Sequence, residues 1–284
     1  MLKQRLLTAA ILLVVLLGAL AAPSAWPILL LLTALAVTAL WEWLRMTMPL
    51  ATRYLVVVLP ALLALLLLWL SQQILADSLS TPGAWFTGAL ARGLMPVIAV
   101  GWPVLALVMV LQAKVTTPPY SYSLSFYGLF ASLALWFSLA VLYITYGAWF
   151  LLSFMGLIWT ADSVAYFVGR SFGKHKLAPR VSPGKTWEGA IGGVLGGLFW
   201  MLLSALWEGS FSFWLHAYWG LGLTVILGIV LIAVSILGDL FESLLKRRAG
   251  FKDSSQLLPG HGGVYDRIDA LYPVAPLALL LMGV

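Results

Sequence analysis

The chain has 284 residues, of which 62% are hydrophobic and only 9% are charged, whereas an ordinary soluble domain has about 25% charged residues. This composition excludes a soluble globular protein and indicates one polytopic membrane domain. The absence of cysteine excludes disulfide bonds and thiolate sites, and the net charge of +6 can be interpreted only once the basic residues are placed along the chain.

Uncharged apolar windows of about 20 residues predict the membrane-spanning helices. We expect an all-α, polytopic integral membrane protein with about nine transmembrane helices, at residues 6–22, 26–43, 54–76, 94–112, 124–142, 146–169, 188–206, 215–238 and 268–284. The uncharged run 124–161 has 38 residues, too many for one span, and is divided near residues 143–147 into a helical hairpin. Residues 1–22 are also compatible with a cleaved signal peptide, but eight further spans favour a retained anchor.

The basic residues are distributed asymmetrically between the predicted loops. The N-terminus and the loops after the second, fourth, sixth and eighth spans hold 15 of the 16 lysines and arginines, and only Arg92 falls on the other side. Because basic loops stay in the cytoplasm, we expect a cytoplasmic N-terminus and an external C-terminus.

The reactive side chains are concentrated in the second half of the chain. Segments 162–188 and 239–269 hold ten of the 16 basic and seven of the ten acidic residues. We therefore divide the chain into N-terminal scaffold helices, residues 1–143, and a catalytic region, residues 144–284, within one continuous membrane domain. Glu42, near a predicted helix end, is interpreted as part of the scaffold.

Four carboxylates are candidate metal ligands. Asp162 interrupts an apolar run, and an ionisable group there suggests a functional site. Asp239 shares a helical face with Glu242 and Lys246, and Asp266 and Asp269 have the same i, i+3 spacing at the start of the last span. Such hard oxygen ligands suit Mg²⁺; the alternative is a salt-bridge network with neighbouring arginines.

Two glycine-containing loops are candidate anion sites. Residues 182–189 place Gly184, Lys185 and two hydroxyl groups before a predicted helix, where backbone N–H groups and the helix dipole favour anions. The spacing is not that of a P-loop. Residues 259–263 form a second turn whose glycines allow close approach of a ligand. The alternatives are ordinary loops or basic loops that attract anionic lipid.

The run from Ser243 to Asp269 resembles the signature of phosphatidate cytidylyltransferases, also called CDP-diacylglycerol synthases, which covers these 27 residues and specifies more than a dozen positions. Residues 162–166 and 182–189 are similar to the second motif region of that family. The N-terminal half has no such signature. Pairs of glycines at residues 192 and 196 and at 193 and 197 indicate close packing with another helix, within the chain or across a dimer.

The resemblance implies transfer of the cytidylyl group of CTP to phosphatidate, which gives CDP-diacylglycerol and pyrophosphate for phospholipid biosynthesis. It implies an active site on the cytoplasmic face of a bacterial inner membrane, a homodimer, Mg²⁺, a second cation such as K⁺, and no nucleic-acid partner. The implied metal ligands are Asp239 and Asp266, with Asp269 and Asp162 as further contributors. The remaining implied catalytic residues are Lys246, Arg247 and Lys252, and the implied substrate-binding residues are Ser182, Lys185, Thr186, Glu188, His261, Gly262, Gly263 and Arg267.

Two alternative functions are compatible with parts of the pattern. A CTP- or ATP-dependent polyprenol or lipid kinase would share the acids, the metal and the lipid acceptor, but would release CDP or ADP instead of pyrophosphate. An ion-coupled transporter could use Asp162 and Asp239 as an ion site. Internal repeats are common in transporters, however, and the two halves of this chain differ strongly in charge.

Overall fold

The computed structural model describes residues 2–76, 82–118 and 120–283. Helices make up nearly all of the regular structure, and the sheet within these ranges is one antiparallel pair of short strands. The predicted class, an all-α membrane protein, is confirmed, and the small strand pair was not predicted.

The first half of the chain forms the helices α1 (Leu2–Leu20), α2 (Trp26–Thr47), α3 (Leu55–Leu75), α4 (Pro82–Ala89), α5 (Met95–Gln112) and α6 (Tyr122–Tyr146), with short helices η1 (Leu50–Thr52) and η2 (Leu90–Leu94). The π-helical turn η2 joins α4 to α5, so one apolar helix runs from Gly83 to Gln112. The predicted span 94–112 therefore began too late. Arg92 ended the uncharged window, but one charge near a helix end does not interrupt the helix.

The second half contains α7 (Ala148–Phe172), β1 (Lys176–Ala178), β2 (Ser182–Thr186), α8 (Trp187–Ser204), α9 (Phe211–Ala249), α10 (Tyr265–Ile268) and α11 (Leu271–Leu281). Helices α6 and α7 meet at Gly147, whose φ of +88° suits glycine, so the predicted division of the long apolar run is confirmed. Helix α9 has 39 residues with a break at Gly220, and it continues well past the predicted end at residue 238.

The described ranges contain seven helices that are long and apolar enough to cross a membrane. The predicted count of nine is not confirmed. The apolar part of α1, Leu6–Leu20, is shorter than a full span, and α11 has 11 residues. Both prolines of the predicted last span, at positions 273 and 276, lie within this short helix.

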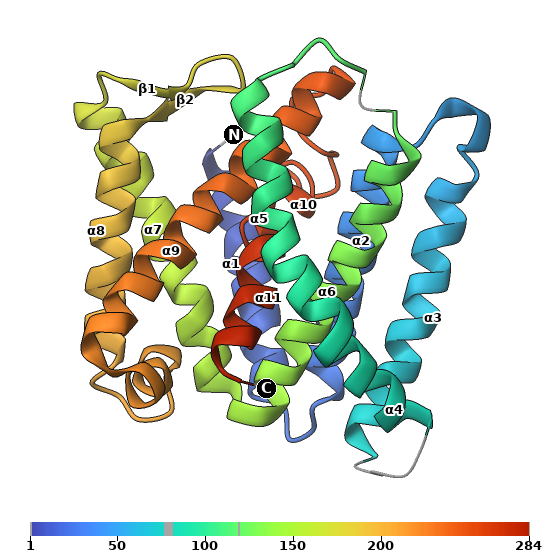
Figure 1. Ribbon diagram of the computed structural model, residues 1–284, viewed down its shortest axis with the longest axis vertical. Coiled ribbons are helices and arrows are strands. Elements are labelled where there is room, and N and C mark those ends of the chain that lie inside the picture. Colours follow the sequence, from blue (N-terminus) through green and yellow to red (C-terminus); the bar gives the residue numbers. More distant parts are fainter. Residues whose placement is uncertain (1, 77–81, 119, 284) are drawn as a thin grey trace.

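The loops that carry the basic residues lie at one end of the molecule, with the strand pair and the start of α1 (Figure 1). Contacts between distant segments agree with this placement: Ser121 donates its N–H to the Thr47 carbonyl, and Arg248 Nε donates to the Lys114 carbonyl at 2.9 Å. We call this end the charged end. The C-terminus and α4 lie at the opposite end.

Helix α8 packs closely on α7 through its glycines. A Cβ atom at Gly192 would lie 2.7 Å from Val168, and one at Gly196 would lie 2.6 Å from Val164. A Cβ at Gly193 would lie 3.0 Å from the Ala161 carbonyl. Of the two readings of these glycines, close packing within the chain is therefore the one observed.

The core contains a cluster of four aromatic side chains that packs against the helices carrying the charged residues. Trp43 of α2 lies with its ring centroid 5.5 Å from that of Phe241, 5.4 Å from that of Tyr265 and 6.0 Å from that of Tyr272. All four side chains are buried, and the Trp43 indole donates to the Leu124 carbonyl. The cluster joins α2 to α9, α10 and α11, so both halves of the chain fix the position of the site.

Candidate active site

Three carboxylates converge at the charged end. Asp239 and Glu242 lie one turn apart on α9, and Asp269 follows α10 directly. One oxygen of each lies within 4.8 Å of the others. Glu242 and Asp269 are buried at 2% and 8% exposure, and Asp239 is partly accessible. The sequence predicted that two helices would aim carboxylates at one point, and this convergence is observed for Asp239 and Asp269.

The cluster has the donor set of a hard divalent cation. Carboxylate oxygens are the protein ligands that Mg²⁺ prefers, and the buried Glu242 Oε1 has no hydrogen-bond partner among the described residues. Burial raises the pKa of Asp269 well above its usual value, and the negative charges of Asp239 and Asp162 raise it further. Bringing a cation into this group would relieve that repulsion, so the residues fit such an ion.

Two lysines pair with these acids. Lys185 of β2 lies with Nζ 2.6 Å from Asp239 Oδ2. Lys246 lies with Nζ 2.7 Å from Glu242 Oε2 and 2.6 Å from Asp266 Oδ1. The ion pair between β2 and α9 connects the two sequence segments that were predicted to form one site.

Asp266 lies outside the three-carboxylate group and has other partners. Its Oδ2 accepts hydrogen bonds from the Ser254 N–H at 2.9 Å and the Gly263 N–H at 2.7 Å. Burial alone would raise the pKa of Asp266, but hydrogen bonding with Glu242 and the charge of Lys246 outweigh burial and lower this pKa to about 2. Asp266 is thus an ionised anchor of residues 250–264, which we call the signature loop.

Asp162, Arg267 and His261 surround the cluster. Asp162 lies on α7 with an accessible side chain, close enough to Asp269 to affect its pKa. Arg267 donates from Nε and Nη2 to the His261 carbonyl at 3.1 and 2.8 Å, which fixes its guanidinium beside the signature loop. His261 Nδ1 is buried without a hydrogen-bond partner in the described structure.

Residues 182–189, predicted as a candidate anion site, form strand β2 and the first turn of α8. Thr186 caps α8, because its hydroxyl accepts the Gly189 N–H at 3.1 Å. Glu188 accepts the Lys174 and His175 N–H groups and lies 2.6 Å from His175 Nδ1. These two side chains therefore hold the strand pair on α8, while Ser182 and Lys185 lie along β2.

Other predicted residues lie at the border of the site. Arg247 and Lys252 are exposed. Gly262 has a φ of +83°, which suits glycine, and a Cβ at Gly263 would collide with the Ser254 hydroxyl and the Glu42 carboxylate. The glycines of this loop are thus required by close approach of the protein's own polar groups.

Sequence reasoning missed two carboxylates. Glu242 was placed on the same face as Asp239 but was not assigned to the metal. Glu42 was interpreted as scaffold, yet its fully buried side chain contacts the signature loop. A charged residue within an apolar helix is a functional candidate by default, and this rule would have identified Glu42 as it identified Asp162.

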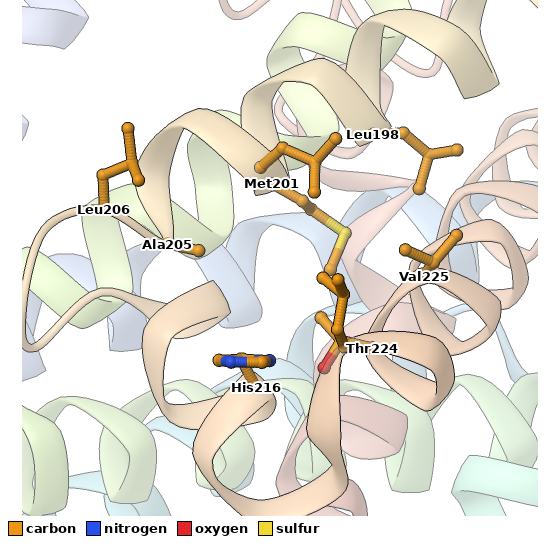
Figure 2. Close-up of a pocket in the computed structure, with 9 residues that line it drawn as sticks. Leu198, Met201, Ala205, Leu206, His216, Thr224 and Val225 are labelled. Carbon is orange, nitrogen blue, oxygen red and sulfur yellow. The ribbon is translucent and has the colours of Figure 1, made fainter.

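An apolar pocket of about 330 Å³ lies between α8 and α9, away from the charged end. Figure 2 shows Met201 and Leu198 above it and His216 and Thr224 below it. Its lining lacks acidic and permanently basic side chains. It is therefore unsuited to a triphosphate, and the candidate site remains the acidic cluster.

Comparisons with known proteins identify the family of this chain. The phosphatidate cytidylyltransferase of Haemophilus influenzae is 37% identical over 289 residues, which cover 97% of this chain and 96% of that protein. The phosphatidate cytidylyltransferases of Pseudomonas aeruginosa and Aquifex aeolicus are 47% and 40% identical over 133 and 134 residues, covering 46% and 47% of each chain. The model of the cytidylyltransferase family matches residues 3–284. The chain therefore belongs to the cytidylyltransferase family.

Proposed function

We propose that this protein is a phosphatidate cytidylyltransferase, which transfers the cytidylyl group of CTP to phosphatidate and releases pyrophosphate. The observation that carries the proposal is the grouping of Asp239, Glu242 and Asp269 beside Lys185 and Lys246 at one end of a membrane bundle. The carboxylates can hold a cation and the adjacent lysines can bind phosphates. This arrangement suits a nucleoside triphosphate. The family membership and the names of the relatives support the same reaction.

The chemistry of the phosphatidate acceptor determines which catalytic groups the protein has to supply. A phosphate monoester is already anionic near neutral pH, so the attacking oxygen of phosphatidate needs little help from a general base. The main difficulty is to bring two polyanions together and to stabilise the charge that develops on pyrophosphate. Lys185, Lys246 and Arg267 are the cations placed to do this, and the exposed Arg247 and Lys252 extend the basic surface.

Mg²⁺ is the proposed cofactor. Asp239, Glu242 and Asp269 would hold it, and Asp266 would act through Lys246 and the signature loop. This revises the ligand set that the sequence suggested, since Glu242 takes the place of Asp266 and Asp162 lies outside the three-carboxylate group. When bound, the ion would supply a Lewis acid that neutralises phosphate charge. A second cation such as K⁺ remains a prediction, tested by comparing activity in potassium and sodium salts.

We propose that the reaction takes place at the cytoplasmic face of a bacterial inner membrane. Support comes from the basic loops at the charged end, because basic loops face the cytoplasm. The ion pair between Lys185 of β2, which lies at this end, and Asp239 connects the acidic cluster to it. A cysteine at Pro118 should react with an impermeant thiol reagent only from the cytoplasmic side, and one at the exposed position of Glu208 only from outside. The reverse pattern would overturn this orientation.

A homodimer remains a prediction from the family resemblance. The glycines of α8 are already packed against α7, so a second copy would have to use another surface. Cross-linking in native membranes, followed by mass determination, would test it.

The decisive experiment follows the fate of labelled CTP. Purified protein in detergent receives phosphatidate, Mg²⁺ and CTP labelled either at the α-phosphorus or at the terminal phosphorus. Cytidylyl transfer puts the α label into lipid and the terminal label into pyrophosphate. A lipid kinase would put the terminal label into lipid, and that result would refute the proposal. Chelation of divalent ions should abolish turnover, and added Mg²⁺ should restore it.

A further inference from the structure

Glu42 is a buried carboxylate with unusual surroundings. It lies in the last turns of α2, within the half of the chain that carries no family signature, and its exposure is 0%. No lysine or arginine pairs with it among the described residues, and its neighbours are instead hydrogen-bond donors. A buried carboxylate is costly unless its charge is balanced by hydrogen bonds, so these donors need to be held in place.

Both ends of the signature loop supply these donors. Oε1 accepts the Val264 N–H at 3.0 Å and the Ser255 hydroxyl, and Oε2 accepts the Tyr265 N–H at 2.6 Å. The Ser254 hydroxyl lies 2.9 Å from Glu42 Oε2 and 2.8 Å from Asp266 Oδ2. One side chain thus joins residues 254–255 to residues 264–265, and its hydrogen-bond network continues to Asp266.

We infer that Glu42 is a positioning residue, a clip that closes the signature loop and thereby orients Asp266 and Lys246 for the reaction. The inference rests on the proposed function for its turnover readout. The structural part of the inference, that Glu42 holds the signature loop closed, does not depend on the proposed function. Glu42 is too far inside the protein to meet substrate, so its action passes through the loop.

The substitution Glu42→Gln tests the clip with little change in size. Each carboxylate oxygen accepts one backbone N–H, from Val264 or from Tyr265. An amide has only one oxygen, so in either orientation its NH₂ group faces one of these two backbone donors, and the attachment of residues 264–265 is weakened. Glu42→Asp keeps the charge but shortens the side chain by one methylene group, so it should restore part of the function.

Two further variants complete the design. Ser255→Ala removes one donor and leaves the carboxylate in place, so it tests the clip even where Glu42→Gln does not fold. Glu208→Gln makes the same chemical change at an exposed position after α8, and it serves as the matched control that should behave like the wild type.

Hydrogen–deuterium exchange of the detergent-solubilised protein, together with kcat and KM for CTP, gives the outcome. Glu42→Gln should speed exchange selectively in residues 253–265 and lower kcat about 10²-fold, as expected when catalytic groups are misplaced. The exchange rates and kcat values of Glu42→Asp and Ser255→Ala should lie between those of Glu42→Gln and those of the wild type. Exchange in the packed helices α7 and α8 should not change.

Two results would overturn the inference. One is wild-type exchange and turnover in Glu42→Gln; the other is faster exchange in all helices with a matching loss of thermal stability, which would mean a purely structural role. Exchange is measured without substrate. If the wild type lacks cytidylyl transfer, the proposed function fails, while exchange still decides whether the clip exists.

Discussion

The two loops that border the acidic cluster are held in different ways. The signature loop, residues 250–264, is fixed through Glu42 and Asp266, with Ser254 and Ser255 buried at 1% and 6% exposure. The strand pair, residues 176–186, is held by the half-buried Glu188 and by an ion pair of Lys185. Water competes with exposed hydrogen bonds and ion pairs and makes them weak. We therefore expect the signature loop to be rigid and the strand pair to be more mobile. We call the signature loop the rigid wall of the site and the strand pair its adjustable wall.

The largest effect is expected from Asp266→Asn, which should both abolish turnover and release the rigid wall. An asparagine cannot accept from Ser254 and Gly263 while also pairing with Lys246. Activity should fall by at least about 10³-fold, as for the loss of a preorganised electrostatic group, and exchange in residues 253–265 should rise. Cytidylyl transfer and hydrogen exchange measure the two effects. Unchanged exchange in residues 253–265 would show that Asp266 does not hold the signature loop in place.

Asp239→Asn should lower turnover by about 10³-fold without loosening the signature loop. Asp239 contacts Lys185 and Ser243 but none of the loop's donors, so its loss should affect cation binding and the Lys185 ion pair but not the signature loop. The measurement is turnover against Mg²⁺ concentration, with elution from a sizing column to confirm folding. Full activity of this variant would show that Asp239 is not a metal ligand.

Lys185→Gln should raise KM for CTP more than it lowers kcat. In the proposed function Lys185 contacts a phosphate of CTP, and charged hydrogen bonds of this kind contribute about 1.5–3 kcal/mol, or about 10- to 10²-fold. Steady-state kinetics with varied CTP measure the change, and Lys176→Gln on β1 is the matched control. Equal effects of the two substitutions would show that only the general basic charge of the strand pair matters.

The smallest effect is expected from Glu188→Gln. The substitution keeps one acceptor for the Lys174 and His175 N–H groups but weakens the contact with His175, whose side chain is 79% exposed. Surface contacts of this kind contribute about 0–1 kcal/mol, so turnover should change by less than about tenfold. A loss as large as that of Asp239→Asn would show that Glu188 contacts substrate directly and that the strand pair is not an adjustable wall.

The sequence by itself determined the protein's class, much of its helix plan and its family resemblance. These properties depend on local composition: apolar windows, the glycine at position 147 and the run 243–269 can each be read without their neighbours in space. The same local reading failed where one charge entered a helix, at Arg92 and at Asp239, because hydropathy marks the apolar part of a helix and not its hydrogen-bonded length.

Only the tertiary structure decided which charges meet. It placed Asp266 with Lys246 and the loop's backbone N–H groups, brought Asp269 to Asp239 and Glu242, and packed the α8 glycines on α7. Glu42 is the clearest case, since its partners lie more than 200 residues away along the chain. A buried carboxylate is balanced by whatever donors surround it, and those donors are set by how the helices pack rather than by the residues beside it in sequence.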